Sequence, residues 1–246
     1  MRFTASALIV LAVAAPIVPA VAQTPPAPAG RTVVAATKLA NVTGKPLRFK
    51  AVGFEISPGA KENFATTDGI LYQVSGSLEV STGTETKTLT PGEGTYIAAA
   101  KSVSVRASGG ERSVSLHFLL VPEGDADQPE TLAFAKELYH IAAPIPGLKS
   151  GPYDLNLTRV TFPAHMPSNA PHHRSGAALY YVISGTGANT VDGKTEQRKP
   201  GDFIYEPTTL VHQWGNPGDV PLTFITFNMN QEGVPAVLPD TPPRGQ

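Results

Sequence analysis

The chain has no cysteine, one tryptophan and three methionines in 246 residues. Without cysteine it forms no disulfide and cannot be acylated as a lipoprotein, so core packing alone must hold the fold together. Charged residues make up 16% of the chain, its formal net charge is −1, and it has no basic run. A positive face for nucleic acid or an anionic membrane is therefore not expected. No nucleophile elbow, P-loop or dinucleotide-binding sequence is present, which leaves acyl and phosphoryl transfer without support.

The first residues have the pattern of a cleavable signal peptide. Arg2 gives a short positive region, residues 5–15 are apolar, and Ala20-Val21-Ala22 is a small-residue cleavage site that makes Gln23 the expected mature start. The apolar run is shorter than the roughly 20 residues that a membrane span requires. The sequence therefore predicts a periplasmic or secreted protein, cut after Ala22, with no membrane segment after cleavage.

Most of the remaining chain consists of two copies of one pattern. Residues 70–110 align without a gap on residues 179–219, sharing the sequences Tyr-x-x-Ser-Gly and Pro-Gly followed by an acidic residue. The copies differ in their imidazoles: His172, His173 and His212 of the second copy align with Asn, Phe and Val in the first. This contrast indicates one supporting domain and one domain that carries a site.

Short runs rich in Val, Ile, Thr, Tyr and Phe, separated by Gly, Pro or Asp-Gly about every ten residues, favour antiparallel β-barrels. Asp192-Gly193 is a strong hairpin signal. One helix is expected between the copies, where Pro129 suits a first helical position and Leu132, Ala135 and Leu138 form an apolar stripe. The predicted organisation is a signal peptide (1–22), a Pro-rich tether (23–36), an N-terminal barrel without ligands (37–125), a helix and linker (126–150), a C-terminal barrel with the candidate site (151–234) and a flexible tail (235–246).

Two motif regions of the second copy resemble the cupin family. One runs from Pro171-His172-His173-Arg174 to the Tyr-Val strand at Tyr181, and the other reads Pro200-Gly-Asp, Pro207, His212 and Asn216. The resemblance implies an all-β protein of two tandem cupin-like barrels, of the double-stranded β-helix or jelly-roll type, in a secreted bacterial protein of bicupin type. It also implies a homodimer as the expected assembly.

Counted back from Tyr181, the ligand positions of the family fall on His172, Arg174 and Ala178, and the third imidazole position falls on His212. His173, one residue out of register, is the candidate replacement. The resemblance thus implies a site for one divalent transition metal (Fe, Mn, Ni, Cu or Zn) held by His172, His173 and His212. Arg174 in the same cavity would instead repel a cation and attract a carboxylate or phosphate. Glu206 is an alternative oxygen ligand, although a solvated glutamate is the simpler expectation.

Tyr181 and Trp214, with Arg174, are the candidate substrate-binding residues, as side chains that line an aromatic pocket. Two classes of function remain open. One is a metal-dependent lyase, isomerase or dioxygenase acting on a small organic acid, sugar or aromatic compound. The other is a metal-free protein that binds or senses such a ligand without turnover. The small molecule is the partner that both share, and the sequence does not identify it.

Overall fold

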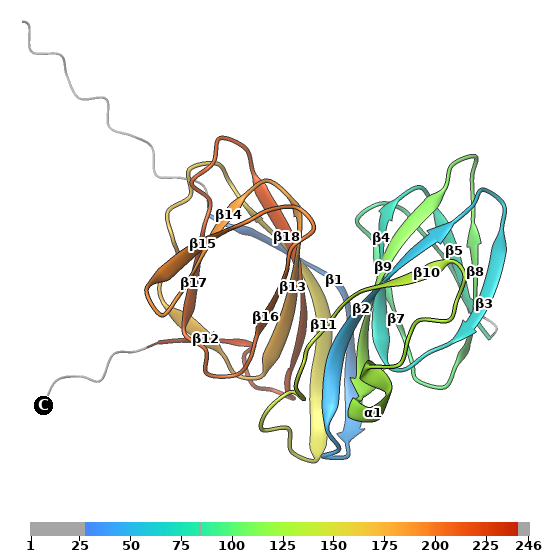
Figure 1. Ribbon diagram of the computed structural model, residues 1–246, viewed down its shortest axis with the longest axis horizontal. Coiled ribbons are helices and arrows are strands. Elements are labelled where there is room, and N and C mark those ends of the chain that lie inside the picture. Colours follow the sequence, from blue (N-terminus) through green and yellow to red (C-terminus); the bar gives the residue numbers. More distant parts are fainter. Residues whose placement is uncertain (1–27, 84, 241–246) are drawn as a thin grey trace, which may run out of the picture.

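The computed structural model describes residues 28–240 apart from residue 84, so the predicted signal peptide and the last six residues lie outside it (Figure 1). The described chain is almost entirely antiparallel β-structure, with strands β1–β19 and one short helix, α1. This confirms the predicted fold class of two tandem cupin-like barrels. None of the helical structure in the described part is long and apolar enough to cross a membrane.

Each barrel is made of two facing sheets. In the N-terminal barrel the sheet orders are β10-β2-β9-β4-β7 and β3-β8-β5-β6. Its elements are β2 (Leu47–Ile56), β3 (Lys61–Ala65), β4 (Gly69–Ser75), β5 (Leu78–Thr82), β6 (Glu85–Leu89), β7 (Gly94–Ile97), β8 (Ser102–Ala107), β9 (Ser113–Pro122) and β10 (Ala135–His140). Helix α1 (Glu123–Ala126) follows β9.

The C-terminal barrel repeats this plan with the sheet orders β1-β11-β18-β13-β16 and β15-β14-β17-β12-β19. Its elements are β1 (Gly30–Val42), β11 (Gly151–Phe162), β12 (His172–Arg174), β13 (Ala177–Ser184), β14 (Gly187–Val191), β15 (Lys194–Arg198), β16 (Phe203–Glu206), β17 (His212–Gly215), β18 (Leu222–Gln231) and β19 (Val237–Pro239). Asp192 and Gly193 both have positive φ, at 49° and 73°, between β14 and β15. This conformation suits a two-residue hairpin turn and confirms the one predicted there.

The two barrels share an apolar core between their large sheets, which lie side by side in the middle of Figure 1. Phe227 of β18 packs against Phe49 of β2 and Phe118 of β9, with ring centroids 5.1 and 5.8 Å apart. Since neighbouring residues of a strand face opposite sides, the other face of each large sheet points into its own barrel. Separate cores fill those interiors.

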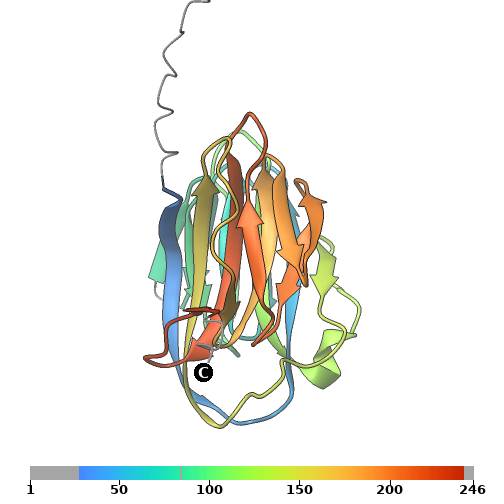
Figure 2. The same cartoon turned by 90° about the vertical axis from the view of Figure 1, so that its left-hand side faces the viewer.

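The barrels also exchange strands, which changes the predicted domain boundaries. Strand β1 pairs with β11 of the C-terminal barrel, beside whose strands it runs in Figure 2. Residues 30–36 were predicted as an unpacked tether and residues 37–42 as part of the N-terminal barrel, and the structure contradicts both assignments. In return, β10 pairs with β2 of the N-terminal barrel although it follows α1 in the chain.

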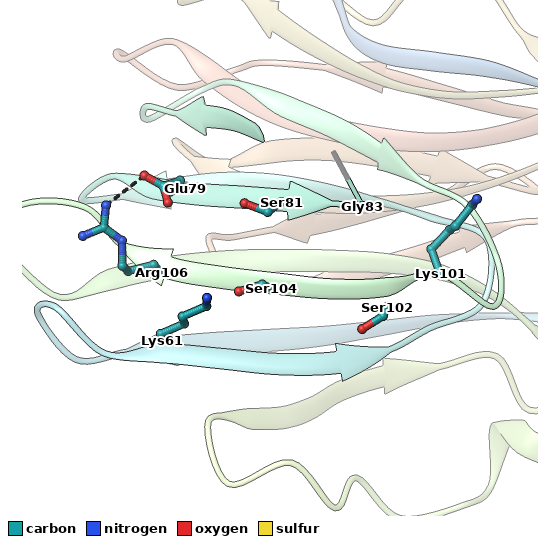
Figure 3. A pocket seen from close by; sticks show the side chains of 8 residues that line it. All are labelled: Lys61, Glu79, Ser81, Gly83, Lys101, Ser102, Ser104 and Arg106. Atoms are coloured by element: carbon teal, nitrogen blue, oxygen red, sulfur yellow. Dashed lines mark hydrogen bonds and ion pairs between the residues drawn. The ribbon is translucent and has the colours of Figure 1, made fainter. Parts of the chain in front are cut away.

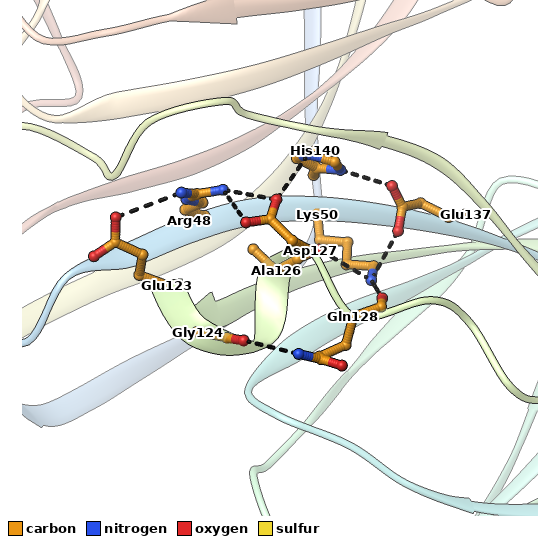
Figure 4. A network of polar contacts seen from close by, with 9 residues as sticks. All are labelled: Arg48, Lys50, Glu123, Gly124, Ala126, Asp127, Gln128, Glu137 and His140. Carbon is orange, nitrogen blue, oxygen red and sulfur yellow. Dashed lines mark hydrogen bonds and ion pairs between the residues drawn. The ribbon is translucent and has the colours of Figure 1, made fainter.

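The predicted inter-domain helix is present as one turn, but at residues 123–126 instead of from Pro129 onward. Leu138 and Ala135, which suggested a helical stripe, lie in β10, where Leu138 is exposed. Pairing with the free edge of β2 overrides the helical pattern because it satisfies a row of backbone groups. A polar network fastens this segment: Arg48 contacts Asp127, and buried Lys50 donates to the carbonyl oxygens of residues 126 and 128 (Figure 4).

Candidate functional site

A buried carboxylate, Glu206, lies at the centre of the C-terminal barrel. It is 1% exposed, and Arg174 beside it is 6% exposed. The indole Nε1 of Trp214 donates to Glu206 Oε1 at 2.9 Å, and Arg174 Nε donates to Oε2 at 3.1 Å. His212 Nε2 lies 2.9 Å from the same Oε2. Three side chains, those of Arg174, His212 and Trp214, thus meet at one carboxylate.

Short strands place these side chains. His172 and Arg174 begin and end β12, and His212 and Trp214 are two residues apart in β17, so each pair points to one face of its strand. His172 is the ladder partner of His212, and their rings lie 4.2 Å apart between centroids. Glu206 ends β16. The site therefore depends on three strands of the C-terminal barrel.

The two histidines hold their rings in the same way. Nδ1 of His172 contacts the carbonyl oxygen of Ala170, and Nδ1 of His212 contacts that of Leu210, both at 2.9 Å. Since a carbonyl only accepts, each Nδ1 carries a proton, and Nε2 is the ring nitrogen that remains for other contacts. The contact of His212 Nε2 with Glu206 is close but poorly aligned, and this buried nitrogen has no hydrogen-bond partner among the described residues.

Burial and neighbouring charges shift the pKa values of Glu206 and His172. Burial alone would raise the pKa of Glu206, but the contact with His212 and the charge of Arg174 outweigh it and hold this pKa below its usual value. Burial, with the nearby charges of His212 and Arg174, lowers the pKa of His172. At neutral pH the cluster therefore contains an ionised glutamate paired with a guanidinium.

Aromatic side chains close one end of the barrel below this cluster. The rings of Tyr180 and Trp214 stack at 5.4 Å with an angle of 15°, and Trp214 also packs on Phe224 at 5.0 Å. The guanidinium carbon of Arg174 lies 5.1 Å from the centre of the Tyr180 ring. This stacking fixes the plane of the guanidinium.

An open cavity of about 640 Å³, lined by both apolar and polar side chains, lies beside Arg174 between β1, β11 and β18. Arg174 lines it from β12 and Arg31 from β1, and the cavity wall also includes Asn156, Thr158, Thr226, Asn228 and Asn230 of β11 and β18. The Oδ1 atoms of Asn228 and Asn230 are buried and have no hydrogen-bond partner among the described residues. Arg174 therefore lies between the cavity and Glu206, lining the one and donating to the other.

Four of the six predicted site residues come together here: His172, His212, Arg174 and Trp214. The structure corrects the prediction for His173, which is the middle residue of β12 and projects to the opposite face from its neighbours. It also corrects Tyr181, which packs in the core between the barrels with its ring 4.8 Å from Phe203. Strand parity explains both differences.

The sequence interpretation missed the importance of Glu206, which was expected to be solvated, and of the asparagines. One signal for the asparagines was available in the last long strand. Between residues 224 and 230, apolar Ile225, Phe227 and Met229 alternate with Thr226, Asn228 and Asn230. A strand that buries its polar side as well as its apolar side indicates a polar interior, and all of these residues are buried, including the unpartnered oxygens of Asn228 and Asn230.

A divalent metal does not fit this cluster as it stands. No three His, Cys, Asp or Glu side chains within residues 28–240 are placed to hold one ion. The carboxylate nearest the imidazoles already binds a guanidinium, whose proton is not released at ordinary pH. The predicted metal site of His172, His173 and His212 therefore lacks a third donor and has a fixed cation beside it.

A second hollow lies on the outer face of the N-terminal barrel, over β3, β5 and β8 (Figure 3). Its side chains include Lys61, Lys101 and the ion pair of Arg106 with Glu79. The paired side chains are 46% and 31% exposed, so solvent competes for every contact. This hollow lacks the buried, converging polar groups of the C-terminal cavity.

Comparison with known proteins agrees with the architecture. Residues 158–228 match the family model described as Cupin domain. Over 53 residues the chain is 36% identical to an uncharacterized protein of Methanocaldococcus jannaschii, a match that spans 22% of this chain and 42% of that protein. The aligned region is thus less than half the length of this curated relative.

Solved structures give a longer match. Oxalate decarboxylase from Bacillus subtilis aligns over 83% of this chain and 74% of its own, with a TM-score of 0.56 and 16% sequence identity. Another structure of that enzyme, with the same identity and coverage, concerns its Mn(II) centers. At this identity the likeness shows a shared fold. Residues 158–228 of the C-terminal barrel thus match a cupin domain, and the chain as a whole has the two-barrel fold of these solved structures.

Proposed function

We propose that the C-terminal barrel binds a small organic acid that also carries hydroxyl groups, and that it does so without a metal ion. The observation that carries this proposal is the position of Arg174. Its guanidinium lines the cavity and is 6% exposed, while its Nε is committed to Glu206. Its terminal nitrogens donate to no other described residue. A carboxylate is the group that a fixed guanidinium binds best.

The rest of the cavity favours hydroxyl groups beside the carboxylate. Asn228 uses its Nδ2 on Asn156 and Thr226, and Asn230 uses its Nδ2 on Val234, so their free Oδ1 atoms can only accept. Both oxygens are buried behind the cavity wall, whose partly exposed polar side chains, Asn156 and Thr158, are the groups that a ligand hydroxyl would meet. Hydroxy acids and sugar acids combine both kinds of group.

The charge around the cavity agrees with an anionic ligand. Arg31 of β1 lines the same cavity as Arg174, whereas Lys38, which also lines it, is paired with the exposed Glu232, and Asp154 is the acidic residue of the lining. Glu206 neutralises part of the charge of Arg174 from behind, so Arg31 supplies the additional positive charge. In the relatives with this fold, the name oxalate decarboxylase refers to a small dicarboxylic acid. Oxalate itself carries no hydroxyl group for the asparagines.

The proposed place of action is outside the cytoplasm, in the periplasm or beyond. It rests on the signal-peptide pattern of residues 1–22. Sequencing the N-terminus of the protein purified from cells should give Gln23. An N-terminus at Met1 would show that the chain stays inside. A homodimer stays a prediction to which we assign no interface.

The binding proposal can be tested with the protein's own fluorescence. Trp214 is the single tryptophan of the chain and donates to the carboxylate that Arg174 holds. We would titrate the protein in EDTA with glycolate, L-malate and D-gluconate, with neutral D-glucose as the matched comparison. Calorimetry would provide a second readout. At least one acid should bind about tenfold or more tightly than glucose, which corresponds to about 1.4 kcal/mol.

A charge variant tests the location. Asn228→Asp places a negative charge in the cavity and leaves the Arg174–Glu206 pair intact, so it should weaken acid binding by about tenfold or more. Asn63→Asp makes the same change on an exposed position of β3 and should have no effect. If no acid exceeds glucose, or if both variants bind like the parent, the proposed function is wrong.

A further inference from the structure

The cation beside Glu206 and the two histidines is a guanidinium, that of Arg174. His172 and His212 have their Nδ1 atoms tied to carbonyl oxygens, which leaves Nε2 of each ring as the nitrogen that a metal ion could bind once it is deprotonated. Glu206 Oε2 is 2.9 Å from one of these nitrogens. Two imidazoles and a carboxylate are ligands that divalent transition metals take readily. In this chain they surround a guanidinium.

Arg174 lies where its charge acts on the oxygen that a metal ion would bind. It follows His172 by two residues on the same face of β12, and its Nε donates to the Oε2 atom that also faces His212. The burial of all four groups strengthens the repulsion between this guanidinium and any divalent ion at the same oxygen. His212 Nε2 is left buried without a hydrogen-bond partner among the described residues.

We propose that Arg174 is a built-in substitute for a metal ion, because its fixed guanidinium takes the place at Glu206 that a divalent ion would need. The guanidinium neutralises Glu206 as an ion would, but it cannot dissociate from the chain. Replacing it with histidine removes the fixed charge and adds a donor two residues from His172. The resulting set, in Arg174→His, contains three imidazoles and one carboxylate. This inference deepens the proposed function and shares its assumption that the native site works without metal.

The test uses the full mature chain, stripped of metal with a chelator that is then removed. Co(II) is titrated with no organic acid present and followed by its visible absorption, and Zn(II) and Mn(II) uptake is measured by plasma mass spectrometry. We expect Arg174→His to bind one equivalent at least about 100-fold more tightly than the parent chain. His212→Ala added to Arg174→His should abolish that gain.

Arg174→Lys is the matched control, because it keeps the positive charge and shortens the side chain. It should bind metal no better than the parent. Far-UV circular dichroism and the Trp214 emission identify folded variants, and Arg174→Ala serves as a second variant if Arg174→His does not fold. The inference is overturned if Arg174→His, or Arg174→Ala in its place, binds Co(II) less than about tenfold more tightly than the parent chain, or if Arg174→Lys binds as tightly as Arg174→His.

The two proposals fail separately. Acid binding is measured in EDTA and metal binding in the absence of acid. A parent chain that binds an acid, together with an Arg174→His variant that gains no metal, refutes the role of Arg174 as a substitute for a metal ion and leaves the proposed function standing. A parent chain that binds no acid, together with a large metal gain in Arg174→His, does the reverse.

Discussion

Replacing His117 with leucine should make the protein less sensitive to acid. His117 lies in β9 inside the N-terminal barrel and is 1% exposed. Its ring packs edge-on against Phe54 and Phe64, with centroids 5.5 and 6.0 Å away. Its Nε2 has no hydrogen-bond partner among the described residues. Burial in these apolar surroundings lowers the pKa of His117 from 6.5 to about 3.

This shift has a definite sign and size. Between about pH 6.5 and pH 3 the unfolded chain binds a proton at this position and the folded chain does not. The free energy of unfolding therefore falls as the pH falls, by about 1.4 kcal/mol for each pH unit. From pH 6 to pH 4 the loss due to His117 is about 2 to 3 kcal/mol. Above pH 6.5 both states are neutral at this residue and the effect vanishes.

The assay is urea unfolding followed by far-UV circular dichroism at several values between pH 4 and pH 7. His117→Leu should show a shallower decline of stability than the parent across this range, with no loss at pH 7, because an unpartnered buried nitrogen is replaced by carbon. His165→Asn is the control, since the His165 side chain is 68% exposed. Equal slopes for the parent and His117→Leu would refute the assignment of a neutral, desolvated imidazole.

Three other substitutions test contacts in the structure by their effect on thermal or urea unfolding. Gly176→Ala would place a Cβ 2.0 Å from a backbone oxygen of β18 and should cost about 1–3 kcal/mol, whereas Gly110→Ala meets nothing within 4 Å and should cost little; equal effects would contradict this packing. Lys50→Met removes three contacts that fasten α1 and β10, so we expect a loss of about 2 kcal/mol, and unchanged stability would show that the network contributes nothing. Trp214→Phe removes a hydrogen bond to ionised Glu206 and should cost about 1.5–3 kcal/mol, unless that carboxylate is protonated in the folded protein.

Local patterns predicted most of the fold. Alternating apolar residues, the Asp192-Gly193 turn and the internal repeat led to two antiparallel barrels, and the structure has them. The exchanged strands could not be predicted in the same way. Whether residues 30–42 pair with β11 or remain free depends on which sheet edge is open, and that information comes from the folded barrels.

The sequence predicted which strands carry the candidate site, but not which side chains of those strands face the barrel interior. The resemblance to the cupin family implied one site for His172, His173 and His212, and of these His172 and His212 lie opposite each other. Glu206 was harder, because a change of one residue in the register of β16 would turn it to solvent. The difference between Tyr180 and Tyr181 has the same origin, since both are plausible pocket residues until the inward face of β13 is known.

Strand β1 gives the cavity an unexpected dependence on the beginning of the chain. Residues of β1, among them Arg31, Val33 and Lys38, form one wall of the cavity, and the residues of its other walls come more than a hundred positions later. A gene fragment that begins after residue 126 would encode every member of the Glu206 cluster but would lack the β1 side of the cavity. A version of this protein shortened to its C-terminal barrel should therefore keep β1, for example by an internal deletion that joins residue 42 to residue 151, which are partners in the β1–β11 ladder.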